Sequence, residues 1–257
     1  MDTPGRYCQL VGPVLQSSMN APKVDSPSYR GHRFPRAIIS HGVWLYFRFS
    51  LSYRDVEEMM AERGIVVSYE SIREWCLKFG AIYSKRIRSR RGRLGDRWHL
   101  DEMFIRIHGR LQYLWRAVDQ EGEVLDILVQ PRRDKRAASK FFRKLLKGMG
   151  YVPRVIVTDK LRSYAAAKSE VMPSVAHHQG KWLNNRVENS HESTRERERR
   201  MRGFKSPGHA QRFLAIFGVI TSFFRPSRHL LTARNYREII GRRFTEWRRL
   251  VGLQVAI

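Results

Sequence analysis

The sequence predicts an α/β protein in which a mixed sheet is covered by helices and preceded by a small all-helical unit. Two patterns indicate this fold class. From residue 97 onward, three strand-like stretches are followed by helix-like and strand-like stretches in alternation. Before residue 80, apolar residues recur at helical spacing instead. The 257 residues, of which 42% are hydrophobic, are enough to bury a core of this kind.

The N-terminal part divides into a leader and a helical unit. Residues 1–28 contain many Pro, Gly, Ser and Asn residues without sustained periodicity, so we expect a disordered leader. Met19 is an alternative start of the chain. Three helices are expected next, over residues 35–47, 53–62 and 69–79.

The second and third of these helices carry start signals. Ser52 and Asp55 form a capping-box-like pair, and Ser68 can cap the third helix. Gly64 lies in the turn between the two helices. Two short helices joined by a Gly-containing turn resemble a helix-turn-helix, whose last helix would read DNA. A plain three-helix bundle is the alternative interpretation.

The α/β part begins with three strands that short turns connect into an antiparallel meander. Asp134 can cap the helix after the meander, and a buried strand, a helix and a short strand or loop follow. A long polar helix begins at Asn184, and residues 213–224 predict a buried helix. The expected strands are residues 98–107, 112–118, 123–129 and 155–158, and the first two helices are residues 134–147 and 161–168.

The net charge of +25 predicts a polyanionic partner, and nucleic acid is the usual one. Residues 85–93 form a dense basic run between the helical unit and the first strand. As a linker between domains this run would follow DNA phosphates, and a solvated tether is the alternative. A ribosomal or chromatin-like protein that only coats nucleic acid could carry the same charge.

Several other classes of protein find little support. Cys8 and Cys76 are the only cysteines, which excludes a disulfide framework or Cys-rich zinc module and fits a reducing compartment. His177 and His178 have no acid or cysteine at zinc spacing, and no Walker loop, dinucleotide fingerprint or nucleophile elbow is present. No signal peptide or membrane-spanning stretch is visible, so we expect a cytoplasmic protein with access to DNA.

Three acidic residues occupy positions that suit a metal site. Asp101 lies inside the first strand, Asp159 ends the fourth strand, and Glu188 lies early in the long polar helix. If the two strands are neighbours, both aspartates face one edge of the sheet, where ligands bind in open α/β folds. Three such acids could hold two Mg²⁺ or Mn²⁺ ions for in-line phosphoryl displacement.

Each acid also has an alternative interpretation. Asp159 could be the N-cap of the next helix, and Glu188 could be a solvated helix residue. Glu102 competes with Asp101 for the first position. Asp119 and Asp134 fit turn and cap roles better. The acids that compete with Glu188 are Glu192, Glu196 and Glu198.

Basic residues around these acids are candidate DNA contacts. The arginines that follow Glu188 could bind phosphates, or could form ion pairs on an exposed helix face. His191 could touch a phosphate, and an ordinary exposed histidine is the default interpretation. The candidate DNA contacts are Arg73, Lys78, Lys85, Arg86, Arg88, Arg90, Arg91, Arg93, Arg195, Arg199, Arg202 and Lys205.

Seven short stretches occur in an order that is highly specific: residues 51–64, 97–102, 113–119, 133–138, 157–159, 184–191 and 202–206. In them the chain resembles the DDE transposases of bacterial insertion sequences, and most closely the insertion-sequence-six family. The resemblance extends from about Tyr29 to Arg237. Met103 and Phe104 depart mildly from the residues that the family often carries after the first Asp-Glu pair.

The resemblance implies a retroviral-integrase-like RNase H fold, a helix-turn-helix that reads terminal inverted repeats, and a DDE triad of Asp101, Asp159 and Glu188. It implies an enzyme that uses Mg²⁺, or Mn²⁺ in its place, to cut the element's ends and to join the freed 3′-hydroxyls to target DNA, with a replicative cointegrate as product. Double-stranded DNA is the expected partner, with no membrane and no nucleotide cofactor, and pairing two ends requires a homodimer or higher multimer.

A catalytically silent helix-turn-helix regulator and an RNase H-like nuclease are the alternative functions. The expected domains are a leader (1–28), a helix-turn-helix domain (29–82), a basic linker (83–96), a catalytic domain (97–225) and a basic tail (226–257).

Overall fold

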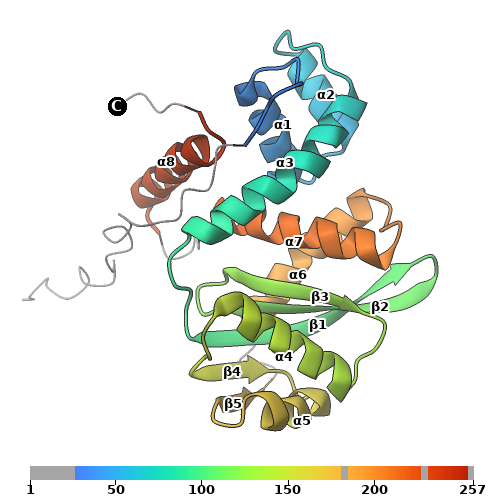
Figure 1. The fold of residues 1–257 in the computed structure, drawn as a ribbon, viewed down its shortest axis with the longest axis vertical. Coiled ribbons are helices and arrows are strands. Elements are labelled where there is room, and N and C mark those ends of the chain that lie inside the picture. The colour runs from blue at the N-terminus through green and yellow to red at the C-terminus, as the bar shows by residue number, and fades with distance from the viewer. Residues whose placement is uncertain (1–26, 181–184, 227–230, 254–257) are drawn as a thin grey trace, which may run out of the picture.

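The structure, a computed structural model, describes residues 27–180, 185–226 and 231–253. A twisted sheet with helices on both of its faces lies beside a group of helices from both ends of the chain (Figure 1). The expected leader, residues 1–28, lies outside the described residues except for its last two positions. Asn184, at which the long polar helix was expected to begin, also lies outside the described residues.

The sheet has five strands in the order β3-β2-β1-β4-β5. The first three strands form the predicted antiparallel meander, and β4 pairs in parallel with both β1 and β5. The predicted fold class, a mixed sheet covered by helices and preceded by a helical unit, is therefore confirmed. The strands are β1 (Arg97–Ile107), β2 (Arg110–Asp119), β3 (Val124–Gln130), β4 (Val155–Thr158) and β5 (Ala176–Gln179).

A two-residue turn sets the register of the long β1–β2 hairpin. His108 and Gly109 both have positive φ, 50° and 74°, as the type I′ hairpin turn requires. The β1–β2 ladder runs without a shift from this turn to the other end of β1, whereas the β1–β4 ladder ends at His99 and Val157. Within the described residues, the second half of β1 therefore has a strand neighbour on one side only.

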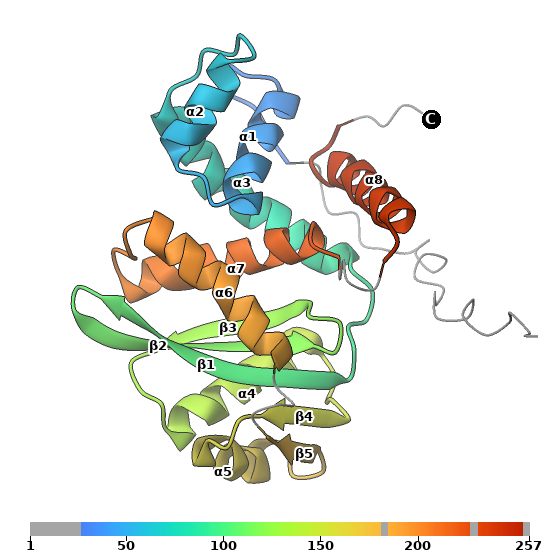
Figure 2. The same ribbon diagram turned by 180° about the vertical axis from the view of Figure 1, so that it is seen from behind.

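Helices cover the two faces of the sheet with separate apolar clusters (Figures 1 and 2). Trp98 and Leu100 of β1 pack on the side of α4 and α5, while Met103 and Ile105 pack on the side of α7. This division follows from the alternation of side chains along a strand. No helix in the described ranges is long and apolar enough to cross a membrane. The covering helices are α4 (Lys135–Met149), α5 (Arg162–Val171), α6 (Asn185–Arg200) and α7 (Pro207–Phe223).

The N-terminal helices match the sequence prediction at their starts. Ser52 Oγ accepts from the Asp55 amide at 3.1 Å, and Asp55 Oδ2 accepts from the Ser52 amide at 2.8 Å, which confirms the capping box. Ser68 likewise caps the third helix. These helices are α1 (Arg36–Arg48), α2 (Tyr53–Ala61) and α3 (Tyr69–Arg90).

The basic run after residue 79 continues the third helix, which was expected to end at residue 79. Helix α3 continues through Arg90 because Phe79, Tyr83 and Ile87, four residues apart, are all buried on one face. The charged residues between them dominate the composition and conceal this apolar stripe. The same buried cluster extends into α7, so the helical unit shares a core with one face of the sheet.

The C-terminal segment is also more ordered than the predicted basic tail. Residues Ala233–Leu250 form helix α8, whose Trp247 and Leu250 are buried. The Trp247 ring lies 5.2 Å from that of Tyr83, edge to face, and the Tyr29 hydroxyl donates to the Val251 carbonyl at 2.8 Å. Helix α8 is therefore docked on α3.

Replacing Trp247 with Ala should lower the free energy of unfolding by about 3–5 kcal/mol, the usual cost of removing a buried Trp. The reason is that its indole fills the contact between α8 and the rings of Tyr83 and Phe224. Chemical denaturation followed by circular dichroism measures the loss. The exposed neighbour Arg248 is the matched control, since Arg248→Ala should change stability by less than about 0.5 kcal/mol. Equal losses in both variants would contradict the docking of α8.

Candidate active site

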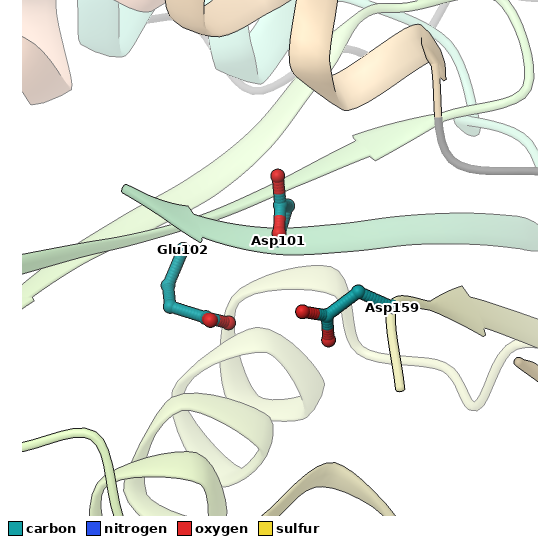
Figure 3. Close-up of side chains that lie close together, drawn as sticks. All are labelled: Asp101, Glu102 and Asp159. Atoms are coloured by element: carbon teal, nitrogen blue, oxygen red, sulfur yellow. The ribbon is translucent and has the colours of Figure 1, made fainter. Parts of the chain in front are cut away.

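The parallel pairing of β1 with β4 brings two of the predicted acids together. His99 faces Val157 in the ladder, and two residues further along each strand lie Asp101 and Asp159. The predicted neighbouring strands are thus present, and both carboxylates lie at the carboxyl end of β4. Asp101 on β1 therefore lies next to Asp159, which directly follows β4 (Figure 3).

Glu102 completes a cluster of three acids in the described part of the chain. Asp101, Glu102 and Asp159 each offer a carboxylate oxygen, and these oxygens lie within 4.8 Å of one another. Glu102 and Asp159 point toward one another on one side of β1, whereas Asp101 points to the side of α6 (Figure 3). Three carboxylate oxygens at this separation suit a hard divalent cation.

Arg133 neutralises part of this negative charge. Its Nε donates to Glu102 Oε1 at 2.5 Å, and its Nη2 lies 3.5 Å from Asp159 Oδ2. Burial raises the pKa of the Glu102 carboxyl, while the Tyr164 hydroxyl and Arg133 act to lower it. Tyr164 is itself fully buried, and burial together with Glu102 raises the pKa of its phenol. Arg133 is thus closer to Glu102 than to Asp159.

Asp159 is not the N-cap of α5, which removes one alternative interpretation. The N-cap position belongs to Leu161, which makes no side-chain cap hydrogen bond. Asp159 Oδ1 instead accepts from the Leu161 amide at 3.0 Å, so one oxygen stabilises the turn and the other faces Arg133. Asp119 and Asp134 do have the expected roles, in the β2–β3 turn and at the start of α4.

Glu188 lies on α6, but its side chain is outside the part of the chain that the structure describes. The structure does describe the side chains of the later part of α6, from Ser190 onward. His191 lies beside Asp101, and the Arg195 guanidinium lies 5.5 Å from the centre of the Phe104 ring. Helix α6 therefore runs along the half of β1 that has no β4 neighbour, and Glu188 lies one turn before His191.

His191 is buried, so the default interpretation of an exposed histidine is wrong. Only 5% of its surface is exposed, and its Nδ1 lies 3.5 Å from Asp101 Oδ2. Burial, together with the nearby charges of Arg116 and Arg195, lowers the pKa of this imidazole to about 3. His191 is therefore neutral at ordinary pH, and a proton on Nδ1 would be donated to Asp101.

Arg116 is a buried charge that the sequence analysis missed. It lies on β2 directly across from Asp101, with 2% of its surface exposed, and burial lowers its pKa to about 10. Its guanidinium donates to the Ser190 carbonyl and to Thr194 Oγ1, the latter at 2.5 Å. Arg116 thus fixes α6 on the sheet next to Asp101. A charged residue inside the apolar stretch 113–118 was the available signal.

The candidate DNA contacts divide by exposure. The prediction that Arg86 contacts DNA is corrected, because its side chain is buried and its guanidinium donates to the Leu250 carbonyl. Arg88 and Arg91 are half-buried and donate to backbone carbonyls, and Arg90 pairs with Glu246 at 3.2 Å. Among the acids that compete with Glu188, Glu192 and Glu196 are exposed and Glu198 is half-buried. The exposed basic candidates are Arg73, Lys78, Lys85, Arg90, Arg93, Arg195, Arg199, Arg202 and Lys205.

Comparison with known proteins assigns the family. Residues 95–227 match the DDE domain of IS240-type transposases. The chain is 30% identical over 208 residues to the transposase of the insertion sequence-like element IS431mec from Staphylococcus aureus, covering 79% of this chain and 91% of that protein. It is 29% identical over the same length to the Staphylococcus aureus transposase of insertion sequence element IS257 in transposon Tn4003, with the same coverage. The chain belongs to the DDE transposases.

A weaker similarity links the chain to a solved structure. The catalytic core of the integrase of HTLV-2, in a complex with magnesium, is 16% identical over 40% of this chain and 68% of that one, with a TM-score of 0.32. At this level the similarity adds nothing to the family assignment, which rests on the sequence relatives.

The low pKa of His191 predicts a measurable effect of pH on stability. Between about pH 3 and its unfolded pKa of about 6.5, the unfolded chain binds a proton at this site that the folded protein does not. Stability should therefore fall as the pH drops below about 6.5, by up to about 1.4 kcal/mol per pH unit from this group. In His191→Gln that contribution should disappear.

Chemical denaturation at about pH 7 and about pH 5.5 measures this contribution. Burial also lowers the pKa of His41, His177 and His209, but their effect is the same in both proteins and cancels in the comparison. The same loss of stability on acidification in the wild type and in His191→Gln would contradict a neutral, buried His191.

Proposed function

We propose that this DDE transposase binds the terminal inverted repeats of its own element, cuts the ends to expose 3′-hydroxyls, and joins these to target DNA. The observation that carries the proposal is the cluster of carboxylates at the carboxyl end of β4, in a transposase with a net charge of +25. Joining two ends to a continuous target would give a replicative cointegrate. The reaction takes place where the DNA is, in the cytoplasm.

Asp101, Asp159 and Glu188 are the residues that we assign to Mg²⁺ binding, with two ions as the expected number and Mn²⁺ as a substitute. The described carboxylates fit such ions, because they provide only hard oxygen ligands within 4.8 Å of one another. When bound, the ions supply positive charge that activates the attacking oxygen and stabilises the leaving oxygen. The proximity of Glu102 makes it the alternative third ligand.

The chain's own residues position the reacting groups. His191 holds the Asp101 carboxylate from the side of α6, and Arg133 balances the charge of Asp159. No side chain has to act as the nucleophile. In the cut, a water oxygen bonds to phosphorus and the bond to the 3′ oxygen breaks; in joining, the freed 3′ oxygen bonds to a target phosphorus and the target's own 3′ oxygen leaves. Exposed arginines on α6 would hold the phosphates on either side.

The helical unit supplies recognition of the ends in this proposal. Helix α3 presents Arg73 and Lys78 on its exposed side and would read the terminal repeats as the last helix of a helix-turn-helix. Its exposed Lys85 extends the basic surface along the same helix. Since both ends of the element are processed together, we propose that a dimer or a higher multimer is the active form on double-stranded DNA.

Asp159→Asn should lower strand transfer at least about 100-fold, because the charge that metal ions bring to the site contributes several kcal/mol to the barrier. The assay combines purified protein, DNA carrying the element's end, a plasmid target and Mg²⁺. Glu192→Gln is the matched control, since Glu192 is an exposed acid of α6, and this variant should join ends at the wild-type rate. Tight binding of ends by the wild type without cutting or joining in either metal would indicate a regulator instead of an active transposase.

Glu102 and Glu188 can be separated by comparing Glu102→Gln with Glu188→Gln. If Glu188 is the third ligand, Glu188→Gln should lose strand transfer and should bind Mn²⁺ at least about tenfold more weakly in calorimetry. Glu102→Gln keeps a hydrogen-bonding group for Arg133, so it should retain Mn²⁺ binding within a few-fold. The reverse pattern would assign the metal to Asp101, Glu102 and Asp159.

A further inference from the structure

Phe104 is a large apolar side chain in an unusual place. It lies on β1 two residues after Glu102, so both side chains are on the same face of the strand and roughly 7 Å apart along it. Of its surface, 52% is exposed, although the residues on either side of it, Met103 and Ile105, are buried. An open aromatic ring therefore lies on the same strand, and on the same strand face as Glu102 of the acid cluster.

The surroundings of this ring are basic. The Arg195 guanidinium lies 5.5 Å from the ring centre, and the exposed Arg106 and Arg110 lie further along the same hairpin. Tyr113 faces Phe104 across the β1–β2 ladder and is half-buried. An exposed aromatic ring with cations around it is the combination that holds a nucleotide, because the base stacks on the ring while the phosphates pair with the cations.

We propose that Phe104 and Arg195 form a stacking site for an unpaired base next to the phosphate that is cut. This inference rests on the proposed function, since it places that phosphate at Asp101 and Asp159. A base within a duplex has no free face, so the end of the element must open locally for its base to reach the ring. The site therefore binds single-stranded nucleotides at the cut, and its role is to keep the end open while the acids act on the backbone.

Charge favours DNA over another protein surface as the occupant of this site. The Arg195 guanidinium lies over the ring, and Arg106 and Arg110 are exposed further along the hairpin; this positive charge suits a polyanion and would repel a second basic copy of the chain. In this proposal the carboxylates position the phosphate that is cut, and the Phe104 ring positions the neighbouring base. An apolar contact between two copies through Phe104 is the competing occupancy, and the experiment distinguishes it.

The test uses the full chain and a duplex of the element's end with 2-aminopurine, a base that stacking quenches, beside the cut. Wild-type protein should quench its fluorescence on binding. Phe104→Leu, which keeps the apolar bulk but lacks a π face, should lose the quenching and cut paired ends about tenfold more slowly. Phe104→Tyr should restore both. The exposed Leu111 on the same hairpin gives the matched control, Leu111→Ala, which should behave as wild type.

A second substrate isolates the role in opening the end. On ends that are already unpaired by mismatches, Phe104→Leu should cut at close to the wild-type rate, because the duplex no longer has to be opened. Unchanged quenching and unchanged cutting of paired ends in Phe104→Leu would overturn the inference and leave the proposed function intact. A loss of self-association in sedimentation, with quenching unchanged, would overturn it in favour of a contact between copies. Failure of the wild type to cut any end would instead refute the proposed function.

Discussion

The parallel register between β1 and β4 is the constraint on which the site depends. Because His99 pairs with Val157, Asp101 and Asp159 come to lie side by side just where the ladder ends. Carboxylates this close repel one another, and the protein offsets that repulsion with the charge of Arg133 between Glu102 and Asp159, while the neutral His191 lies beside Asp101. The same ladder end leaves the second half of β1 open to α6, so one feature of the sheet creates both the cluster and the space beside it.

Helix α6 connects this site with the helical unit through two buried arginines. Arg116 holds the helix on β2 near Ser190, and Arg197, two turns later, is fully buried and donates to the Leu51 carbonyl at 2.6 Å. The Arg197 guanidinium also lies 4.2 Å from the centre of the Tyr46 ring, a favourable cation–π contact. The helix that carries Glu188 is thus attached to the sheet at one end and to α1 and the loop after it at the other. Its position depends on both parts of the molecule.

Local signals allowed much of the fold to be predicted. The capping box at Ser52 and the hairpin turn at Gly109 each depend on neighbouring residues alone, and each is present in the structure. The proximity of Asp101 and Asp159 was predicted on the condition that their strands are neighbours, and in the structure β1 does lie next to β4. The functional role of these residues, and that of Glu188, remains a prediction.

Buried charges could not be predicted in the same way. Arg86 and Arg197 are surrounded in the sequence by other basic or polar residues, which normally indicate a solvated surface, whereas Arg116 stands alone as a charge in an apolar stretch. Their burial depends on carbonyl acceptors that are distant in the chain, such as Leu250 for Arg86. Helix α8 was missed for a related reason, since its two buried residues are few among many arginines.

The most direct test of this account is the location of Mn²⁺ by anomalous diffraction in crystals of the protein bound to its end DNA. The account predicts metal density between the carboxylates of Asp101 and Asp159, with the Glu188 carboxylate reaching it from α6 and the imidazole of His191 on Asp101. Metal density held by Asp101, Glu102 and Asp159 while Glu188 faces solvent, or metal density away from Asp101 and Asp159 altogether, would contradict it.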